Sequence, residues 1–324
     1  MRYAQLGSFG SVSRLILGGG GLGRLWGETT AEEAIATIHA AVDAGIDVVD
    51  SAPSYRDCEA VIGSTFGGSP PAHLRFTTKC QLGEPMRGEV AGRLESSLNA
   101  SLAAMRLERV DIFFLHSNIR PDDYRYARFD DRRTGFATPW SMYVEEVVPA
   151  MEALKAAGRI GAWGITGTGI PQDILAAIAH DPAPTVVQAV ANLMDSAGSM
   201  RAYAESARPR EIIATAKARG LGVLGIRAVQ AGALTAVIDR ALKDSHPETS
   251  DYRRAEPFRA LCAELGEDPA VVAHRYALDM EGVDSVILGV KNRAELADCL
   301  RAEAAGPLPA EVRTRIDALG LTAA

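Results

Sequence analysis

The chain repeats one unit, a short apolar strand followed by a helix, eight times. The expected strands cover residues 15–17, 46–51, 76–79, 110–116, 160–166, 186–190, 222–226 and 285–288. The expected helices cover residues 30–44, 58–66, 90–105, 144–157, 171–179, 209–219, a pair near 253–265 and 269–280, and 293–304. Alternating strands and helices indicate a parallel sheet, and eight units favour closure over an open sheet. The pattern therefore predicts a (β/α)8 barrel of the TIM type.

The same pattern predicts a single domain over residues 1–324. A chain of 324 residues with 47% hydrophobic residues can bury one large core, and no change in composition marks a linker. Residues 1–14 predict a β-hairpin that plugs the bottom of the barrel. Residues 118–143 and 227–252 are too long to be turns, and both leave from the carboxyl-terminal face. We expect these two long loops to be lids or substrate walls.

Three consecutive strands end on Asp50, Lys79 and His116. In a parallel barrel the carboxyl ends of the strands surround one mouth, so we expect these side chains to meet there. A carboxylate at the end of a buried strand costs several kcal/mol, roughly, unless a cation lies beside it. Lys79 ends the next strand and supplies that cation. Tyr55 follows Asp50 by one short loop and belongs to the same mouth.

These residues also carry a family resemblance. Asp50-x-Ala-x-x-Tyr55 followed by Glu59, then a Thr-Lys strand end at Lys79 and a Leu-His strand end at His116, resembles the aldo-keto reductases. Members are barrel enzymes that move a hydride between a nicotinamide cofactor and a carbonyl or an alcohol. The resemblance extends over nearly the whole chain and places the family's catalytic roles on Asp50, Tyr55, Lys79 and His116. It implies a small-molecule substrate. This would be a carbonyl compound, namely an aldehyde, a ketone or a sugar, or the alcohol that corresponds to it.

The chemistry of carbonyl reduction gives each of these residues a role. A phenol with a pKa of about 10 is a poor acid at neutral pH, and a neighbouring ammonium lowers that pKa. Lys79 would provide the ammonium, Asp50 would orient it, and His116 would polarise the carbonyl. Taken singly, Asp50 and Lys79 could be a structural ion pair, Tyr55 a rim residue and His116 a core histidine. Their joint occurrence favours catalysis.

The glycine run after the first strand, residues 18–23, contains a Gly-x-Gly-x-x-Gly match. A dinucleotide-binding Rossmann unit would need a helix that begins on the glycines and an acidic strand end about twenty residues later. We expect neither here. Gly19 and Gly20 are instead predicted to form a floor without side chains beneath the nicotinamide. A flexible glycine loop is the alternative.

The resemblance implies further cofactor contacts, with departures from the family pattern. The family usually has a Ser-Asn pair after the fifth strand, whereas Thr166 here keeps only a hydroxyl and Gly167 lacks an amide side chain. Gln188 matches the family's glutamine contact to the carboxamide. The family commonly stacks a tyrosine on the ring after strand seven, and here Ile226 and Arg227 stand in that region. An aliphatic or guanidinium surface would replace the aromatic one.

The segment after the eighth strand resembles the family's adenosine-phosphate site. Gly289 begins it, and Lys291 and Arg293 could pair with a 2′-phosphate, which favours NADP. Glu295 suits a ribose hydroxyl better than a phosphate, so NAD is the alternative. The two cations could also serve only the first turn of the following helix.

Trp26, Trp140 and Tyr143 are the expected substrate walls, with packing as the alternative. Arg56 stands where the family normally has glycine, and it adds a positive charge near the mouth or reaches solvent. No spacing typical of metal ligands appears, so we expect no metal site.

The overall charge restricts the partners. A net charge of −7 and a pI near 5.5 argue against nucleic acid or an anionic membrane as a partner, because phosphate binding needs a basic face.

No apolar run is long enough to span a membrane, and no secretory signal begins the chain, so a cytoplasmic location is expected. The four cysteines have no paired Cys-x-x-Cys spacing and are expected to be reduced. The oligomeric state stays open.

Two rival functions remain at this stage. One is a non-redox isomerase or dehydratase on the same barrel, with Tyr55 and Lys79 as acid–base groups. The other is a nucleotide-sensing binding protein. The departures at Gly167, Ile226 and Arg227 motivate both.

Overall fold

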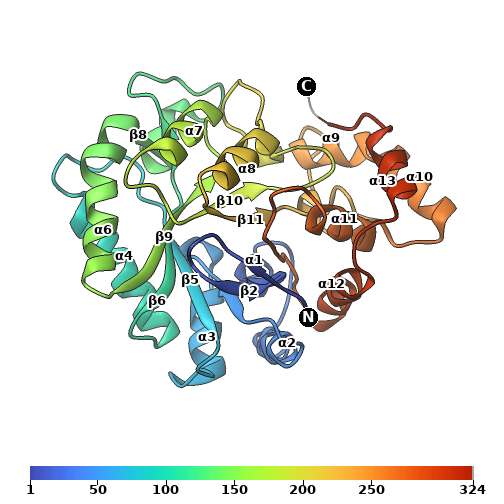
Figure 1. Ribbon diagram of the computed structural model, residues 1–324, viewed down its shortest axis with the longest axis horizontal. Helices are drawn as coiled ribbons and strands as arrows, with labels where there is room; N and C mark the ends of the chain where they lie inside the picture. The colour runs from blue at the N-terminus through green and yellow to red at the C-terminus, as the bar shows by residue number, and fades with distance from the viewer. Residues whose placement is uncertain (323–324) are drawn as a thin grey trace.

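The computed structural model describes residues 1–322 and contains the predicted barrel of eight parallel strands (Figure 1). Each strand pairs in parallel with the next, and the last pairs with the first, so the sheet is closed. In order around the barrel the strands are β3 (Leu15–Gly18), β4 (Val48–Asp50), β5 (Arg75–Cys80), β6 (Val110–Leu115), β9 (Ile160–Gly167), β10 (Val186–Val190), β11 (Gly222–Ile226) and β12 (Ser285–Ile287). The fold expected from the strand-helix repeat is therefore confirmed.

Helices surround the strands, close to the expected positions. None within residues 1–322 is long and apolar enough to cross a membrane. The longer ones are α2 (Ala31–Asp43), α3 (Cys58–Phe66), α4 (Val90–Met105), α6 (Val148–Ala156), α7 (Pro171–Ala179), α8 (Pro209–Ala218), α9 (Pro247–Arg254), α10 (Glu256–Leu265), α11 (Pro269–Leu278), α12 (Arg293–Ala305) and α13 (Ala310–Asp317).

Two helical regions differ from expectation. The helix expected from residue 144 begins earlier, with α5 (Trp140–Met142) and a π-helical turn (Tyr143–Val147) before α6. Pro149 in the first turn of α6 has no amide hydrogen, so it cannot make the α-helical bond to the preceding turn, and the chain widens there. The carboxyl-terminal helix α13 was not expected from the sequence.

The amino-terminal hairpin closes the bottom of the barrel as predicted. Strands β1 (Tyr3–Gln5) and β2 (Ser11–Ser13) pair antiparallel. Leu6 between them is 1% exposed and belongs to a buried apolar cluster with the inward-facing side chains of the barrel. The other fully buried members are Val12, Ile16, Val48, Ile112, Phe114, Ala162, Val186 and Leu224.

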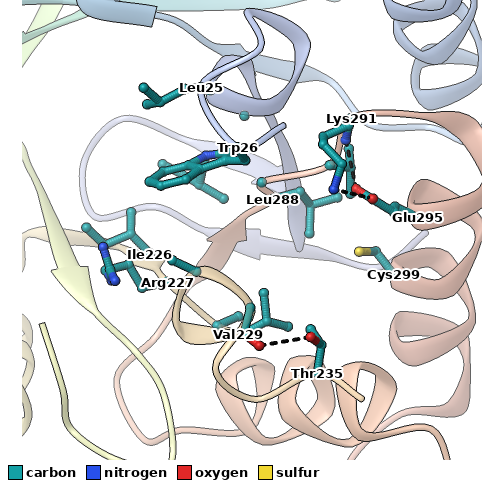
Figure 2. A pocket seen from close by; sticks show the side chains of 18 of the residues that line it. Leu25, Trp26, Ile226, Arg227, Val229, Thr235, Leu288, Lys291, Glu295 and Cys299 are labelled. Carbon is teal, nitrogen blue, oxygen red and sulfur yellow. Dashed lines mark hydrogen bonds and ion pairs between the residues drawn. The ribbon is translucent and has the colours of Figure 1, made fainter. Parts of the chain in front are cut away.

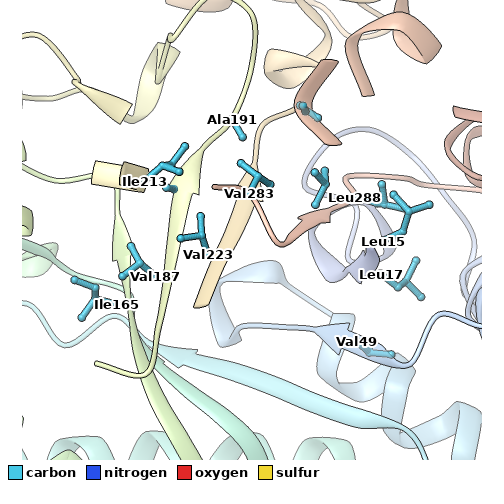
Figure 3. Packing of buried hydrophobic residues seen from close by; sticks show 14 of the residues in the cluster. Leu15, Leu17, Val49, Ile165, Val187, Ala191, Ile213, Val223, Val283 and Leu288 are labelled. Carbon is cyan, nitrogen blue, oxygen red and sulfur yellow. The ribbon is translucent and has the colours of Figure 1, made fainter. Parts of the chain in front are cut away.

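Both faces of the strands are buried, which explains their continuous apolar sequences. Ile16 lies in the interior cluster, whereas its neighbours Leu15 and Leu17 belong to the larger cluster between strands and helices. Figure 3 shows Val187 and Val223 on adjacent strands in that outer layer, with Ile213 of α8 beside them. Because helices cover the outside of each strand and side chains fill the interior, neither face of a strand meets solvent. Polar residues therefore do not alternate with apolar ones along the sequence.

The long connections contain more regular structure than expected. Within residues 118–143, β7 (Asn118–Arg120) pairs in parallel with β8 (Ala137–Pro139). Arg120 is 2% exposed, and its guanidinium lies 2.7 Å from Glu84. The other connection, after β11, contains a short 3-10 turn (Gln230–Gly232) and the start of α9.

The glycine run folds into one helical turn, α1 (Gly19–Leu22), so the expectation that no helix begins on the glycines is wrong. The turn is tightly packed by backbone on both sides. A β-carbon on Gly21 would overlap the carbonyl oxygen of Val290, and one on Gly23 would overlap the carbonyl oxygen of Tyr55. The glycines therefore let β3 lead directly into contact with the Tyr55 loop and with the segment after β12.

Replacing Gly23 by alanine should force the Tyr55 segment to move. Overpacking of this kind destabilises a protein by about 1–3 kcal/mol, which urea unfolding would measure. Gly92→Ala is the matched control, because a β-carbon there meets nothing within 4 Å and alanine favours the helix. Equal stability of Gly23→Ala and the wild-type protein would contradict the packing argument.

Candidate active site

The strand-end residues Asp50 and Lys79 form a buried ion pair at the carboxyl-terminal end of the barrel. Lys79 Nζ lies 2.6 Å from Asp50 Oδ2 and also donates to the carbonyl oxygen of Ser51 at 2.8 Å. The two side chains are 0% and 2% exposed. Lys79 is therefore the cation beside Asp50, as the sequence predicts.

The second carboxylate oxygen of Asp50 has its own donors. Thr77 Oγ1 donates to Asp50 Oδ1 at 2.7 Å, and Gln188 Nε2 donates to the same oxygen at 2.8 Å. Burial by itself lowers the pKa of Lys79, but Asp50 and then Tyr55 outweigh that effect and raise the pKa overall. The lysine therefore carries a full positive charge that cannot move.

Tyr55 lies between this charge and His116. Lys79 Nζ is 4.7 Å from the centre of the Tyr55 ring, and the rings of Tyr55 and His116 meet edge to face with centroids 5.9 Å apart. Burial raises the pKa of Tyr55, and Lys79 opposes the rise. Lys79 thus acts in the expected direction, but burial outweighs it. The phenol keeps its proton at neutral pH.

His116 is held in its neutral form. Burial lowers the pKa of His116 to about 3, and the charge on Lys79 contributes to the decrease. A neutral imidazole has one N–H donor. The ring can therefore donate a hydrogen bond without carrying a charge.

An elongated cavity of about 630 Å³ begins at Tyr55 and His116 and ends beside α12. Figure 2 shows Trp26, Arg227 and the Lys291–Glu295 pair around it. Nine of the residues expected to bind a cofactor line this cavity: Gly19, Gly20, Thr166, Gln188, Ile226, Arg227, Gly289, Lys291 and Glu295. Trp26, an expected substrate wall, lines it as well. Within residues 1–322, no cluster of His, Cys, Asp or Glu has the geometry of a metal site.

Three of the expected site residues lie elsewhere. Trp140 and Tyr143 stack with centroids 5.6 Å apart and pack against His180, and neither lines the cavity. Both residues lie in the helical segment that begins at Trp140, and their position outside the cavity does not agree with a substrate wall. Arg293 is 60% exposed and donates to Glu33 Oε2 at 2.9 Å, outside the cavity.

Two of the cavity contacts differ from the expected ones. Gln188, expected to contact a carboxamide, donates to Asp50 while it lines the cavity. Thr166 Oγ1 donates to the carbonyl oxygen of Leu115 at 3.3 Å. Both side chains are thus fixed in place before any ligand binds.

Arg227 lines the cavity, and two of its three guanidinium nitrogens have partners. Its Nε donates to Gln230 Oε1 at 2.8 Å, and its Nη2 lies 2.5 Å from Glu248 Oε1. The remaining nitrogen, Nη1, is buried and has no hydrogen-bond partner in the described part of the chain. A buried guanidinium nitrogen without an acceptor suits a phosphate oxygen. The lining of the cavity is therefore compatible with a dinucleotide, and Arg227 is a residue that could hold one of its phosphates.

The far end of the cavity contains more negative than positive charge. Lys291 Nζ lies 2.6 Å from Glu295 Oε1 and also contacts Asp239 Oδ2. The backbone amide of Lys291 donates to Glu295 Oε2 at 2.9 Å. Asp239 was not expected from the sequence, because it lies 52 residues before Lys291 in a connection without a recognisable motif.

Two solved structures are similar to this fold over nearly the whole chain. The glycerol dehydrogenase AKR11B4 from Gluconobacter oxydans aligns with a TM-score of 0.70 and 19% identity over 98% of this chain and 94% of that one. The holo form of the aldo-keto reductase AKR11C1 from Bacillus halodurans aligns with a TM-score of 0.71 and 20% identity, over 98% and 96%. These alignments support the fold.

Sequence comparison identifies the family. The chain is similar to L-galactose dehydrogenase from Arabidopsis thaliana, with 24% identity over 92% of this chain and 86% of that protein. A model of the Aldo/keto reductase family matches residues 14–320. Because the match covers nearly the whole chain, this protein belongs to the aldo/keto reductase family of oxidoreductases.

Proposed function

We propose that this protein interconverts a carbonyl compound and an alcohol by hydride transfer, with Tyr55 as the acid–base group. The observation that carries the proposal is the position of Tyr55 between charged Lys79 and neutral His116, at one end of a cavity that suits a dinucleotide. Such cavities with a few polar groups and perturbed pKa values are typical of active sites. The nicotinamide cofactor, when bound, would supply or accept the hydride.

Residues of the chain would polarise the substrate carbonyl and supply the proton that its oxygen needs. As negative charge develops on that oxygen, the Tyr55 hydroxyl gives it a proton, and Lys79 stabilises the phenolate that remains. The neutral His116 ring donates a hydrogen bond to the same oxygen and polarises the carbonyl. Asp50 keeps Lys79 charged and in place. Alcohol oxidation would use the same steps in reverse.

The two rival functions predict different observations. A non-redox isomerase would make product with no change in the near-ultraviolet absorbance of the reduced nicotinamide. A nucleotide sensor would bind the cofactor without turnover. Consumption of cofactor with a panel of carbonyl compounds supports the oxidoreductase over both.

For the cofactor, the geometry favours NAD, the alternative to the NADP expected from the sequence. The expectation of NADP depended on Lys291 and Arg293. Arg293 is paired with Glu33, and Lys291 lies between Glu295 and Asp239. A 2′-phosphate would share Lys291 with two carboxylates, whereas a ribose hydroxyl can donate to one of them. We therefore infer a preference for NAD.

Replacing Tyr55 by phenylalanine should lower the turnover number by roughly 10²–10⁴ while cofactor affinity stays near that of the wild type, because only proton transfer is removed. Steady-state rates and a fluorescence titration of the cofactor would separate the two quantities. Tyr143→Phe is the control, since that buried hydroxyl has no hydrogen-bond partner in the described chain and lies outside the cavity. Wild-type turnover in the Tyr55 variant would exclude it as the proton donor.

His116 should stay neutral as the pH falls toward its pKa of about 3. NMR of the ring nitrogens would show no protonation at mildly acidic pH, with the spectrum of His116→Gln for assignment. The unfolded chain binds this proton near pH 6.5, roughly, so the stability that the neutral ring contributes is complete above that pH and is lost as the pH decreases toward 3. An imidazolium signal at pH 6 from the folded protein would contradict the proposed donor.

Removing negative charge beside Lys291 should shift cofactor choice toward NADPH. The double variant Glu295→Gln, Asp239→Asn leaves Lys291 free to pair with a 2′-phosphate, and we expect the affinity ratio of NADPH to NADH to rise about tenfold, or ~1.4 kcal/mol. Titration of both cofactors would measure the ratio. Asp244→Asn is the control, because Asp244 pairs with Arg253 at 2.7 Å and does not line the cavity. A wild-type preference for NADPH that the double variant does not change would argue against this account.

A further inference from the structure

A second cavity, of about 400 Å³, adjoins the first at the Tyr55 end. The two share only Ser54 and His116 among their lining residues. Its walls come from the loop after β4, the strand end of β5 and the first two turns of α4. We call it the α4 pocket, lined by Pro53, Ser54, Cys80, Gln81, Leu82, Arg93, Ser96, Ser97 and His116.

The α4 pocket continues from the position where the reacting carbonyl would lie. His116 faces both cavities, so a carbonyl oxygen at His116 leaves the rest of the substrate beside the pocket. The rings of Trp140 and Tyr143, which would have favoured an aryl substrate, do not line it. Its volume is within the range of about 300–1,000 Å³ that is usual for small-molecule sites.

Hydrogen-bond donors predominate in this lining. The guanidinium of Arg93 is 66% exposed and forms an ion pair with Glu89 at 3.6 Å. It makes no shorter contact with an acceptor within residues 1–322, so an anionic ligand would compete with this one carboxylate. Ser96 and Ser97 lie on the same helix and add two hydroxyls. Gln81 uses its amide nitrogen on the carbonyl oxygen of Gly135 at 3.1 Å, which leaves its oxygen for a ligand.

We propose that the α4 pocket binds the end of the substrate remote from the carbonyl, and that this substrate is a hydroxylated carbonyl compound with a carboxylate or phosphate at that end. Arg93 would pair with the anionic group, since a guanidinium binds both anions through paired N–H donors. Ser96, Ser97 and Gln81 would bind the hydroxyls. The inference rests on the proposed function, because it takes His116 as the contact of the carbonyl oxygen.

Matched substrates test the assignment by kinetics. Glyceraldehyde against glyceraldehyde 3-phosphate isolates a phosphate, and glucose against glucuronate isolates a carboxylate. We expect kcat/KM to be higher for the anionic member of at least one pair, and Arg93→Met to reduce that preference roughly tenfold, as for the loss of one charge-assisted hydrogen bond. Arg219→Met, at the opposite end of the barrel after α8, should leave the preference unchanged.

Two results would overturn the assignment: no preference for either anion in the wild type, or the same preference in the Arg93 variant. The pair that shows the preference identifies the anion as phosphate or carboxylate.

A binding measurement separates this inference from the proposed function. Gluconate has the hydroxyls and the carboxylate but no carbonyl, so calorimetry reports the pocket without turnover. We expect gluconate to bind the wild-type protein and to bind Arg93→Met roughly tenfold more weakly, with Arg219→Met as the control. If no carbonyl compound consumes cofactor, the proposed function fails, yet Arg93-dependent binding of gluconate still supports the pocket. No binding, or equal binding by both proteins, overturns it.

Discussion

The buried ion pair of Asp50 and Lys79 is the interaction on which the active site depends. Two charges inside a protein are stable only when each is paired and its remaining hydrogen-bonding capacity is filled. Here Lys79 has Asp50 and the carbonyl of Ser51, and Asp50 has Thr77 and Gln188 as further donors. Removing either charged partner would leave an uncompensated charge, typically at a cost of about 3–5 kcal/mol. The pair therefore depends on the pairing of β4 with β5, and the hydrogen bond from Gln188 depends on closure of the barrel.

That requirement ties the fold to the reactive phenol. Asp50 and Lys79 end neighbouring strands, and Gln188 reaches Asp50 from the other side of the barrel, so the charge on Lys79 is fixed relative to the strands. Tyr55 is on a loop, and its position depends on the close approach of Gly23 to its backbone. Strand register thus fixes the position of the Lys79 ammonium, and the glycine turn fixes the position of the Tyr55 phenol.

The sequence predicted what depends on local order along the chain and missed what depends on distant contacts. Strand ends share one face of a barrel, so the meeting of Asp50, Lys79 and His116 followed from the repeat alone. Asp239 lies in a long connection, and nothing near it in the sequence points to Lys291. Trp140 was expected in a long loop, but the helical segment begins on it, and its ring packs against Tyr143 outside the cavity.

The cations at the two ends of the site, Lys291 and Arg93, differ in how closely carboxylates pair with them. We base the selectivity proposed for each end on this difference. At the far end of the large cavity, Lys291 is paired with Glu295 and Asp239, so a phosphate there would compete with two carboxylates for this lysine. In the α4 pocket, Arg93 is largely exposed and pairs with one carboxylate, that of Glu89 at 3.6 Å. The proposed anion site thus lies at the end of the substrate remote from His116, and the proposed preference for NAD leaves the ribose without a phosphate.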